Sequence, residues 1–456
     1  AACAIFGCFS DDKLSKASAR DAEISKCAAE EHEGGAFSFS RHGKNVTIIF
    51  LDKAVSSFFP IICAQDPRIE KSFSGFRYYP NTASFYSHTI LSVPSLFGGY
   101  GYSPEAMDDD RTRSMKEKHN NALLRLPLAF VSEGGRACVS DMPLKNYEWV
   151  SDNSMFEKHG IQGSNLSGAF TRRYLSDGFG LDPSPFYGSS LLKHDMLIYG
   201  FMRVVPAELN RRLYNSGKYL NASLLALKQK LPGENLSFID AYSVLHYLPE
   251  ISDVSDDDRV HLNILCNDAS HEPVFLQYPD YEPSETVTDK GPDIFGNEEI
   301  FRHYHVNAAA LRKIASWLEW MKGQGIYDNS RIIIVSDHGA PFSTPAVKEQ
   351  MAVEHNPLLL IKDFGAKGKL VSDDAFMTCA DVPLEAMSGV VMDMSDRMTG
   401  KPCNRPDKDK GIDILIGNRH NPEEFPESGC LFKGDFLVNV RDMFDASKWA
   451  PAERQP

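Results

Sequence analysis

Short apolar runs that alternate with longer helical segments are the feature that most constrains the fold of this chain. Each run is apolar at nearly every position, as in parallel strands that are covered on both faces. A long amphipathic helix is predicted at 297–322, with its apolar residues on one stripe. The runs are NVTIIFL at 45–51, HLNILC at 261–266, RIIIV at 331–335 and PLLLI at 357–361, with a shorter strand at 137–140.

This alternation predicts an α/β fold, a doubly wound and mostly parallel sheet flanked by helices, with a small C-terminal α+β portion. We expect an N-terminal stalk or membrane-proximal segment at 1–44, polar over most of its length and without a clear strand. A catalytic domain at 45–400 follows, and a C-terminal extension at 401–456 packs on it. In such sheets the functional site lies beyond the carboxyl ends of the strands. The polar residues that follow the strands are therefore the candidates for chemistry.

Charge and cysteine content exclude some classes of function. The chain has 48 Lys and Arg against 62 Asp and Glu, a net charge of −14, so it lacks the basic face that non-specific nucleic-acid binding needs. The nine cysteines form no CxxC pair, which argues against a zinc ribbon. No apolar run reaches the roughly 18 residues that cross a bilayer. The stub at 1–9 fits either the end of a membrane segment or a soluble strand, and we expect the apolar stretch at 191–205 to pack in the core.

Two acids and a histidine at strand ends form a candidate metal site. Asp52 directly follows the strand at 45–51, and Asp337 and His338 follow the strand at 331–335, before Gly339. Two carboxylates and one imidazole suit Mn²⁺ or Mg²⁺ and tolerate Zn²⁺. The alternative is a hydrogen-bonded loop turn without a metal.

A hydroxyl-rich segment at 84–100, SFYSHTILSVPSLFGGY, is the second candidate. A hydroxyl at a helix N-terminus is favoured by the positive end of the helix dipole, which stabilises an alkoxide or a bound anion. Thr89 and Ser92 are the two hydroxyls considered as nucleophiles. The alternative is an ordinary capping segment before a packed helix.

Further candidates lie in loops near the predicted carboxyl edge of the sheet. His271 lies in SHEP after the strand at 261–266, and His355 precedes the strand at 357–361. Lys145 and Asn146, in the loop after the strand at 137–140, are candidates for binding a phosphate or a headgroup hydroxyl, with Trp149 beside them. The alternative for this loop is a plain surface loop. His303 and His305, in the body of the long helix, are interpreted as packing or surface residues.

In combination these motifs resemble the alkaline phosphatase/sulfatase superfamily. The order is a strand ending in an acid, then HTILSVPSLFGGY, then SHEP, then SDHG and a late histidine, and the resemblance covers roughly 45–400. The branch that it is most similar to contains the lipoteichoic acid synthases and glycerol-phosphate transferases, of which the chain resembles the extracellular catalytic domain. SVPSL lacks the arginine of the sulfatase motif, which makes a sulfatase and Ser92 the weaker readings.

The resemblance implies roles for individual residues. Thr89 matches the nucleophilic threonine, which is also a metal ligand together with Asp52, Asp337 and His338. His271 and His355 match histidines that hold the phosphoryl group or protonate the leaving group. One main divalent metal is implied, Mn²⁺ in preference to Mg²⁺ or Zn²⁺, and no organic cofactor.

The function expected from these matches is transfer of glycerol phosphate from phosphatidylglycerol, through a phospho-threonine intermediate, to a cell-envelope polysaccharide. The expected setting is the cell membrane, with the catalytic domain extracytoplasmic and attached through a membrane segment outside this chain. Phosphoethanolamine transfer, and a phosphodiesterase or sulfatase of the same fold, are the alternatives. A non-catalytic module that binds phosphorylated glycans is a further one.

Overall fold

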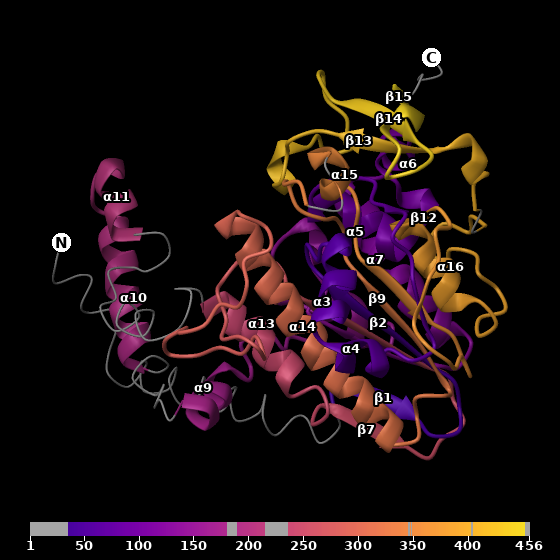
Figure 1. Cartoon of the computed structure of the whole chain (residues 1–456). Helices are drawn as coiled ribbons and strands as arrows, with labels where there is room; N and C mark the ends of the chain where they lie inside the picture. The colour runs from indigo at the N-terminus through magenta and orange to yellow at the C-terminus, as the bar shows by residue number, and fades with distance from the viewer. Residues whose placement is uncertain are drawn as a thin grey trace.

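An eight-stranded sheet forms the centre of the molecule (Figure 1). The computed structural model describes residues 35–179, 189–214, 236–344, 347, 349–402 and 405–451. The strands lie in the order β11-β3-β10-β9-β2-β8-β5-β6. Their bounds are β2 (Asn45–Leu51), β3 (Phe76–Tyr78), β5 (Arg136–Ser140), β6 (Gln162–Ser164), β8 (His261–Asn267), β9 (Ser330–Val335), β10 (Leu359–Lys362) and β11 (Val371–Ser372). The four long apolar runs of the sequence are thus β10, β9, β2 and β8, which are neighbours in the middle of the sheet.

Parallel pairing dominates this sheet, which confirms the predicted fold class. β2 pairs in parallel with both of its neighbours, so that Ile48 lies opposite Ile264 of β8 and Ile333 of β9. β5 and β6 continue the parallel array beyond β8. β10 runs antiparallel to β9 and β3. The carboxyl ends of β2, β5, β8 and β9 therefore meet at one edge of the sheet, and the start of β10 lies at the same edge.

Helices cover both faces of the sheet because successive side chains of each strand point to opposite faces. In β2, Ile49 and Leu51 belong to one buried cluster, and Val46, Ile48 and Phe50 belong to the other. The helices that contribute to the first cluster include α3 (Phe59–Gln65), α4 (Pro67–Ser72), α13 (Leu236–His246) and α14 (Glu298–Gly323). Those that contribute to the second include α5 (Thr89–Gly98), α7 (Met115–Ser132) and α16 (Val382–Met387).

The C-terminal extension forms a small antiparallel sheet of β13 (Ile412–Ile416), β14 (Phe436–Val440) and β15 (Trp449–Pro451). It lies beside the first helix of the second face, because Leu415 and Leu437 share a buried cluster with Ile90 and Leu91 of α5. In Figure 1 this sheet (yellow) lies above α5 and α7. The extension thereby covers the N-terminal end of α5.

Strand β1 (Phe37–Ser40) lies in the segment where we expected a stalk without a strand, so that expectation is wrong for residues 37–40. β1 pairs in parallel with β7 (Ser252–Ser255), and all four of its residues are buried. Two of its backbone N–H groups donate to side-chain amide oxygens, that of Ser38 to Asn263 Oδ1 (3.0 Å) and that of Ser40 to Asn45 Oδ1 (2.7 Å). A strand of four residues that alternates Phe and Ser is too short for its pattern to be recognised in the sequence.

Helix α10 (Ser189–Met202) contradicts the expectation that its apolar stretch packs in the core. Of its described side chains and those just after it, Leu197 is 48% exposed, Phe201 49% and Val204 65%, while Ile198 is buried. Figure 1 shows α10 and α11 (Ala207–Tyr214) standing to one side of the α/β body. Among the described residues, no helix has both the length and the hydropathy that crossing a bilayer requires.

Candidate active site

The register between β2 and β9 brings the predicted metal ligands together. Phe50 lies opposite Val335, so the chain positions two residues further on, Asp52 and Asp337, are also opposite each other. His338 follows directly. One ligand atom from each of Asp52, Asp337 and His338 lies within 4.8 Å of the others, and all three residues are buried. The structure thus assembles at one edge the three residues that the sequence places on two strands.

The polar atoms of this cluster fit a divalent cation. His338 Nδ1 lies 2.7 Å from the carbonyl oxygen of Gly339, which can only accept, so Nδ1 carries the proton and Nε2 presents its lone pair. That Nε2 lies 3.5 Å from Asp337 Oδ2 and 3.9 Å from Asp52 Oδ1. Both carboxylate oxygens are buried and have no hydrogen-bond partner among the described residues. Three unsatisfied ligand atoms therefore converge on one point, as a bound metal requires.

Electrostatics in the cluster also favour a cation. Burial raises the pKa of Asp52 well above its usual value, and the charge of Asp337 raises it further. Burial lowers the pKa of His338, so its imidazole is neutral, the form that binds metals. The second oxygen of Asp337 accepts hydrogen bonds from the backbone N–H groups of Lys53 (3.2 Å) and His338 (2.9 Å), which fix its orientation. A divalent ion would neutralise the repulsion between the two carboxylates.

A glycine closes this turn. A Cβ at Gly339 would lie 1.9 Å from the carbonyl oxygen of Val353, so no larger residue fits there. Gly339 N–H donates to Glu354 O (2.9 Å), which ties the SDHG turn to α15 (Gln350–Glu354). This packing brings His355, the residue after α15, to the same edge.

Thr89 occupies the first position of α5, as expected for a hydroxyl at a helix N-terminus. It is half-buried, and the preceding residue, His88, is the N-cap with an extended backbone and no side-chain cap. The ring centroid of His88 lies 6.1 Å from that of His338. This distance places the start of α5 beside the cluster of Asp52, Asp337 and His338, which we call the cation cluster because it could hold a cation. Ser92 is fully buried, and its Oγ bonds the carbonyls of Tyr86 (2.7 Å) and His88 (2.9 Å). Thr89 is therefore the more accessible of the two candidate nucleophiles.

The two predicted histidines differ in protonation. Burial acts to lower the pKa of His271, but Glu272, 3.3 Å from its Nδ1, and Asp52 outweigh it and raise the pKa to about 9. His355 is buried, and burial together with His338 lowers its pKa to about 3. At neutral pH His271 holds a proton that it can give away, whereas His355 is a neutral imidazole. His303 and His305 are both buried in α14, in line with their interpretation as packing residues.

The loop after β5 has an unusual backbone, with positive φ at Asp141, Leu144, Asn146 and Tyr147. Left-handed non-glycine residues store strain and cluster at functional sites. Lys145 is buried, and its Nζ donates to the side-chain oxygens of Asn153 (2.6 Å) and Asn165 (3.0 Å).

Asn146 and Trp149 have different surroundings. Asn146 exchanges two hydrogen bonds with the side chain of Asn120 of α7, at 2.9 and 3.1 Å. Trp149 is 65% exposed. Burial raises the pKa of Asp141 to about 6, although two backbone N–H groups bond its carboxylate. The loop thus holds a buried lysine and a half-buried acid next to the sheet edge, while Trp149 lies on the surface.

Four residues near the cluster were not among the sequence candidates. Lys53 and Asp268 each follow a strand end, as Asp52 does, so the same rule applied one residue further would have found them. His88 directly precedes Thr89. His420 belongs to the C-terminal extension, and its ring centroid lies 4.9 Å from that of His88. No pattern in the sequence signals His420, because only tertiary packing brings it to the site.

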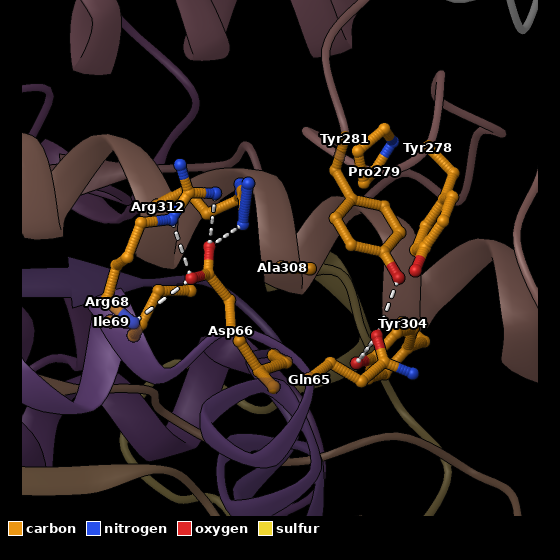
Figure 2. Close-up of a pocket in the computed structure, with 11 residues that line it drawn as sticks. Gln65, Asp66, Arg68, Ile69, Tyr278, Pro279, Tyr281, Tyr304, Ala308 and Arg312 are labelled. Atoms are coloured by element: carbon orange, nitrogen blue, oxygen red, sulfur yellow. Dashed lines mark hydrogen bonds and ion pairs between the residues drawn. The ribbon is translucent and has the colours of Figure 1, made fainter.

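A separate pocket of about 80 Å³ lies on the outer side of α3, α4 and α14 (Figure 2). Gln65 Oε1 accepts hydrogen bonds there from Tyr281 (2.8 Å) and Tyr304 (2.7 Å), and Asp66 is paired with Arg68 and Arg312. Ligand pockets are usually several hundred Å³. In this small pocket the acid is paired with two arginines and the tyrosine hydroxyls bond a glutamine, so we interpret it as a contact between helices that receives no ligand.

Solved structures that are similar to the chain include a protein in the alkaline phosphatase superfamily from Vibrio parahaemolyticus, with a TM-score of 0.45 and 13% identity over 92% of this chain and 84% of that chain. The lipoteichoic acid synthase LtaP from Listeria monocytogenes has a TM-score of 0.42 and 10% identity, over 91% and 87%. The phosphonate monoester hydrolase of Agrobacterium radiobacter has 0.42 and 12%, over 90% and 88%. No protein family and no curated protein matches the sequence. At these scores the chemistry is argued from the residues of this chain alone.

The cation cluster predicts a specific response to loss of one carboxylate. Asp337→Asn removes an anionic ligand, so the affinity for Mn²⁺ measured by titration calorimetry should fall roughly 100-fold or more. Mn²⁺ should raise the melting temperature of the unaltered chain and leave that of the variant unchanged. Asp258→Asn, an exposed acid elsewhere, is the matched control. Equal Mn²⁺ binding by Asp337→Asn and the control would contradict the assignment.

The raised pKa of Asp52 predicts a pH-dependent stability difference in the metal-free protein. The folded state binds the Asp52 proton more tightly than the unfolded state, so this group destabilises the fold progressively as pH rises from about 3.8 through the raised pKa. Asp52→Asn removes that cost. Urea unfolding with a chelator should therefore show an advantage of the variant that grows with pH in this range, by at most about 1.4 kcal/mol per unit. A difference that does not vary with pH would refute this origin.

Proposed function

We propose that the chain is a metal-dependent phosphotransferase that moves glycerol phosphate from phosphatidylglycerol to a cell-envelope polysaccharide, through a phospho-Thr89 intermediate. The observation that carries the proposal is the placement of Thr89 at the start of α5, one residue from His88, whose ring lies 6.1 Å from His338 of the cation cluster. A threonine hydroxyl is a poor nucleophile at neutral pH unless a neighbouring group activates it. In this arrangement the activating neighbour would be the cation cluster, which lies beside the start of α5.

Asp52, Asp337 and His338 would hold the cation, with Thr89 Oγ as a further ligand, and the oxygen-rich set favours Mn²⁺. When bound, a divalent ion lowers the pKa of a hydroxyl at its side and offsets charge on phosphoryl oxygens. Lys53 is a further positive charge of the site, besides the protonated His271. It acts electrostatically on Asp52, His88, His271 and His338, and no ion-pair partner of its side chain lies within the described residues.

In the first half of the proposed reaction, Thr89 Oγ gives its proton to solvent water and forms a bond to phosphorus. The bond between phosphorus and the diacylglycerol oxygen breaks, and that oxygen takes a proton from His271, which is then neutral. In the second half, an acceptor hydroxyl gives its proton to His271 and displaces Thr89 from phosphorus, and the Thr89 oxygen takes a proton back from water. Glu272, next to His271, favours the protonated imidazole with which the cycle begins and ends. His355, neutral and buried, contributes a ring nitrogen for binding rather than a proton.

Two further features support a phospholipid headgroup as the substrate. Lys145 and Asn146 lie in the strained loop at the same sheet edge and would contact the phosphate or a glycerol hydroxyl, with Trp149 at the rim. The apolar side chains of α10 are exposed, and so are Arg203 and Arg212 in the segment that follows it, a combination that suits an anionic lipid surface. The proposal places the enzyme at the outer face of the cell membrane, attached through a segment outside this chain.

The proposed intermediate predicts a covalent adduct that mass spectrometry of the intact protein can detect. Incubation with Mn²⁺ and phosphatidylglycerol should add one glycerol phosphate to the intact protein, and Thr89→Ala should show none, because it lacks the attacking oxygen. Ser92→Ala tests the other candidate nucleophile and should still form the adduct, more slowly because the bonds that shape the segment before Thr89 are lost. An adduct that persists in Thr89→Ala would exclude this nucleophile. An adduct from phosphatidylethanolamine alone would exclude the proposed donor, and release of glycerol phosphate to water despite added glycan would favour a hydrolase.

The exposed surface of α10 predicts binding to anionic vesicles. Replacing Leu197, Phe201 and Val204 with serine should lower the fraction that floats with phosphatidylglycerol-containing vesicles on the order of tenfold or more, since each buried apolar side chain contributes about 1.5–3 kcal/mol. Met392→Ser, which removes a 94% exposed apolar side chain elsewhere, is the control and should leave flotation unchanged. Equal flotation of the triple variant and the unaltered chain would mean that α10 does not contact lipid.

A further inference from the structure

The C-terminal extension is bonded directly to the segment that carries the proposed nucleophile. Tyr86, three residues before Thr89, donates its hydroxyl proton to the carbonyl oxygen of Arg419 (3.1 Å) and accepts from the N–H of the same residue (3.0 Å). Leu415 N–H donates to Phe85 O at 2.9 Å. The residue that follows Arg419 is His420, so these bonds set its distance from α5.

The backbone around His420 is held by interactions within the extension itself. Glu424 accepts the N–H of His420 (2.7 Å) and that of Asn421 (3.3 Å), the latter as part of a capping box. Arg419 is paired with Asp435, and its guanidinium lies 3.9 Å from the centroid of Phe432. Interactions of the residues before and after His420 therefore fix the position of its Cα atom.

The ring of His420 is directed at the active site. Its centroid lies 4.9 Å from that of His88, with 37° between the ring planes, and His88 in turn lies 6.1 Å from His338. A row of three imidazoles thus leads from the extension to the cation cluster. One nitrogen of His88 bonds Ser87 Oγ (3.0 Å), whereas the ring of His420 is exposed and makes no hydrogen bond to the described residues.

We propose that His420, together with His88, binds a non-bridging oxygen of the substrate phosphoryl group above Thr89, so that the C-terminal extension is part of the active site. This inference rests on the proposed function. A phosphodiester presents two non-bridging oxygens, and the site has two groups to receive them: the cation cluster on one side and the histidine pair on the other. Both histidines offer ring N–H groups to phosphoryl oxygens.

The alternative is that His420 only stacks on His88 and stabilises the extension. The two roles predict different effects when the His420 ring is replaced by glutamine or by alanine. A hydrogen-bonding role is kept in part by glutamine, whose amide N–H reaches a similar distance, and is lost in alanine. A stacking role is lost in both variants, and the loss appears in the melting temperature rather than in ligand binding.

The test uses the full chain loaded with Mn²⁺ and inorganic phosphate as the probe. Titration calorimetry should show that His420→Ala binds phosphate about tenfold more weakly, the loss expected for one hydrogen bond to a charged group. His420→Gln should recover part of the affinity, and Mn²⁺ binding should be unchanged in both. His42→Ala, an exposed histidine at the opposite edge of the sheet, is the matched control. The same variants are then assayed with bis(p-nitrophenyl) phosphate, where His420→Ala should raise KM about tenfold.

The outcomes separate this inference from the proposed function. The inference is overturned if His420→Ala binds phosphate as tightly as the control does. It is also overturned if His420→Ala and His420→Gln both lower the melting temperature and glutamine restores none of the phosphate affinity. An unaltered chain that shows neither turnover nor a Thr89 adduct overturns the proposed function. The phosphate titration then still decides whether His420 belongs to an anion site.

Discussion

The repulsion between two buried carboxylates is the constraint on which the rest of the site depends. Asp52 and Asp337 face each other because β2 and β9 pair in parallel over their whole length, and each has an oxygen without a hydrogen-bond partner within the described residues. Burying like charges together is costly unless a cation binds between them. The sheet that stabilises the fold therefore creates a site where a divalent cation could neutralise two facing carboxylates.

The start of α5 is held between this cluster and the C-terminal extension. Inside α5, Ser92 bonds the carbonyls of Tyr86 and His88, so its hydroxyl is used to shape the segment. Tyr86 bonds the extension at Arg419. Thr89 is left half-buried between the two, at the helix end where backbone N–H groups favour negative charge. The proposed nucleophile is thus positioned by bonds that its neighbours make on both sides.

The sequence predicts the sheet and the cluster because both follow from local rules. Strands buried on both faces are apolar throughout, which identified β2, β8 and β9, and acids directly after such strands identified Asp52 and Asp337. His420 follows no such rule, since its place depends on how an extension more than 300 residues after Thr89 packs on α5. Helix α10 was wrongly expected in the core, because apolar helices are more often buried than exposed and the sequence does not show what covers a helix.

In the proposed reaction, the residues that choose between an alcohol and water as acceptor differ from the residues of the cation cluster. Attacking and leaving oxygens are in line at phosphorus, so diacylglycerol departs on the side opposite Thr89. The acceptor must then displace Thr89 from that same side, along the path that the lipid vacated. His271 and Glu272, in the loop after β8, are the groups proposed to exchange protons there. In this proposal the loop after β8 would decide which hydroxyl reaches phosphorus, whereas the cation cluster would only make phosphorus open to attack.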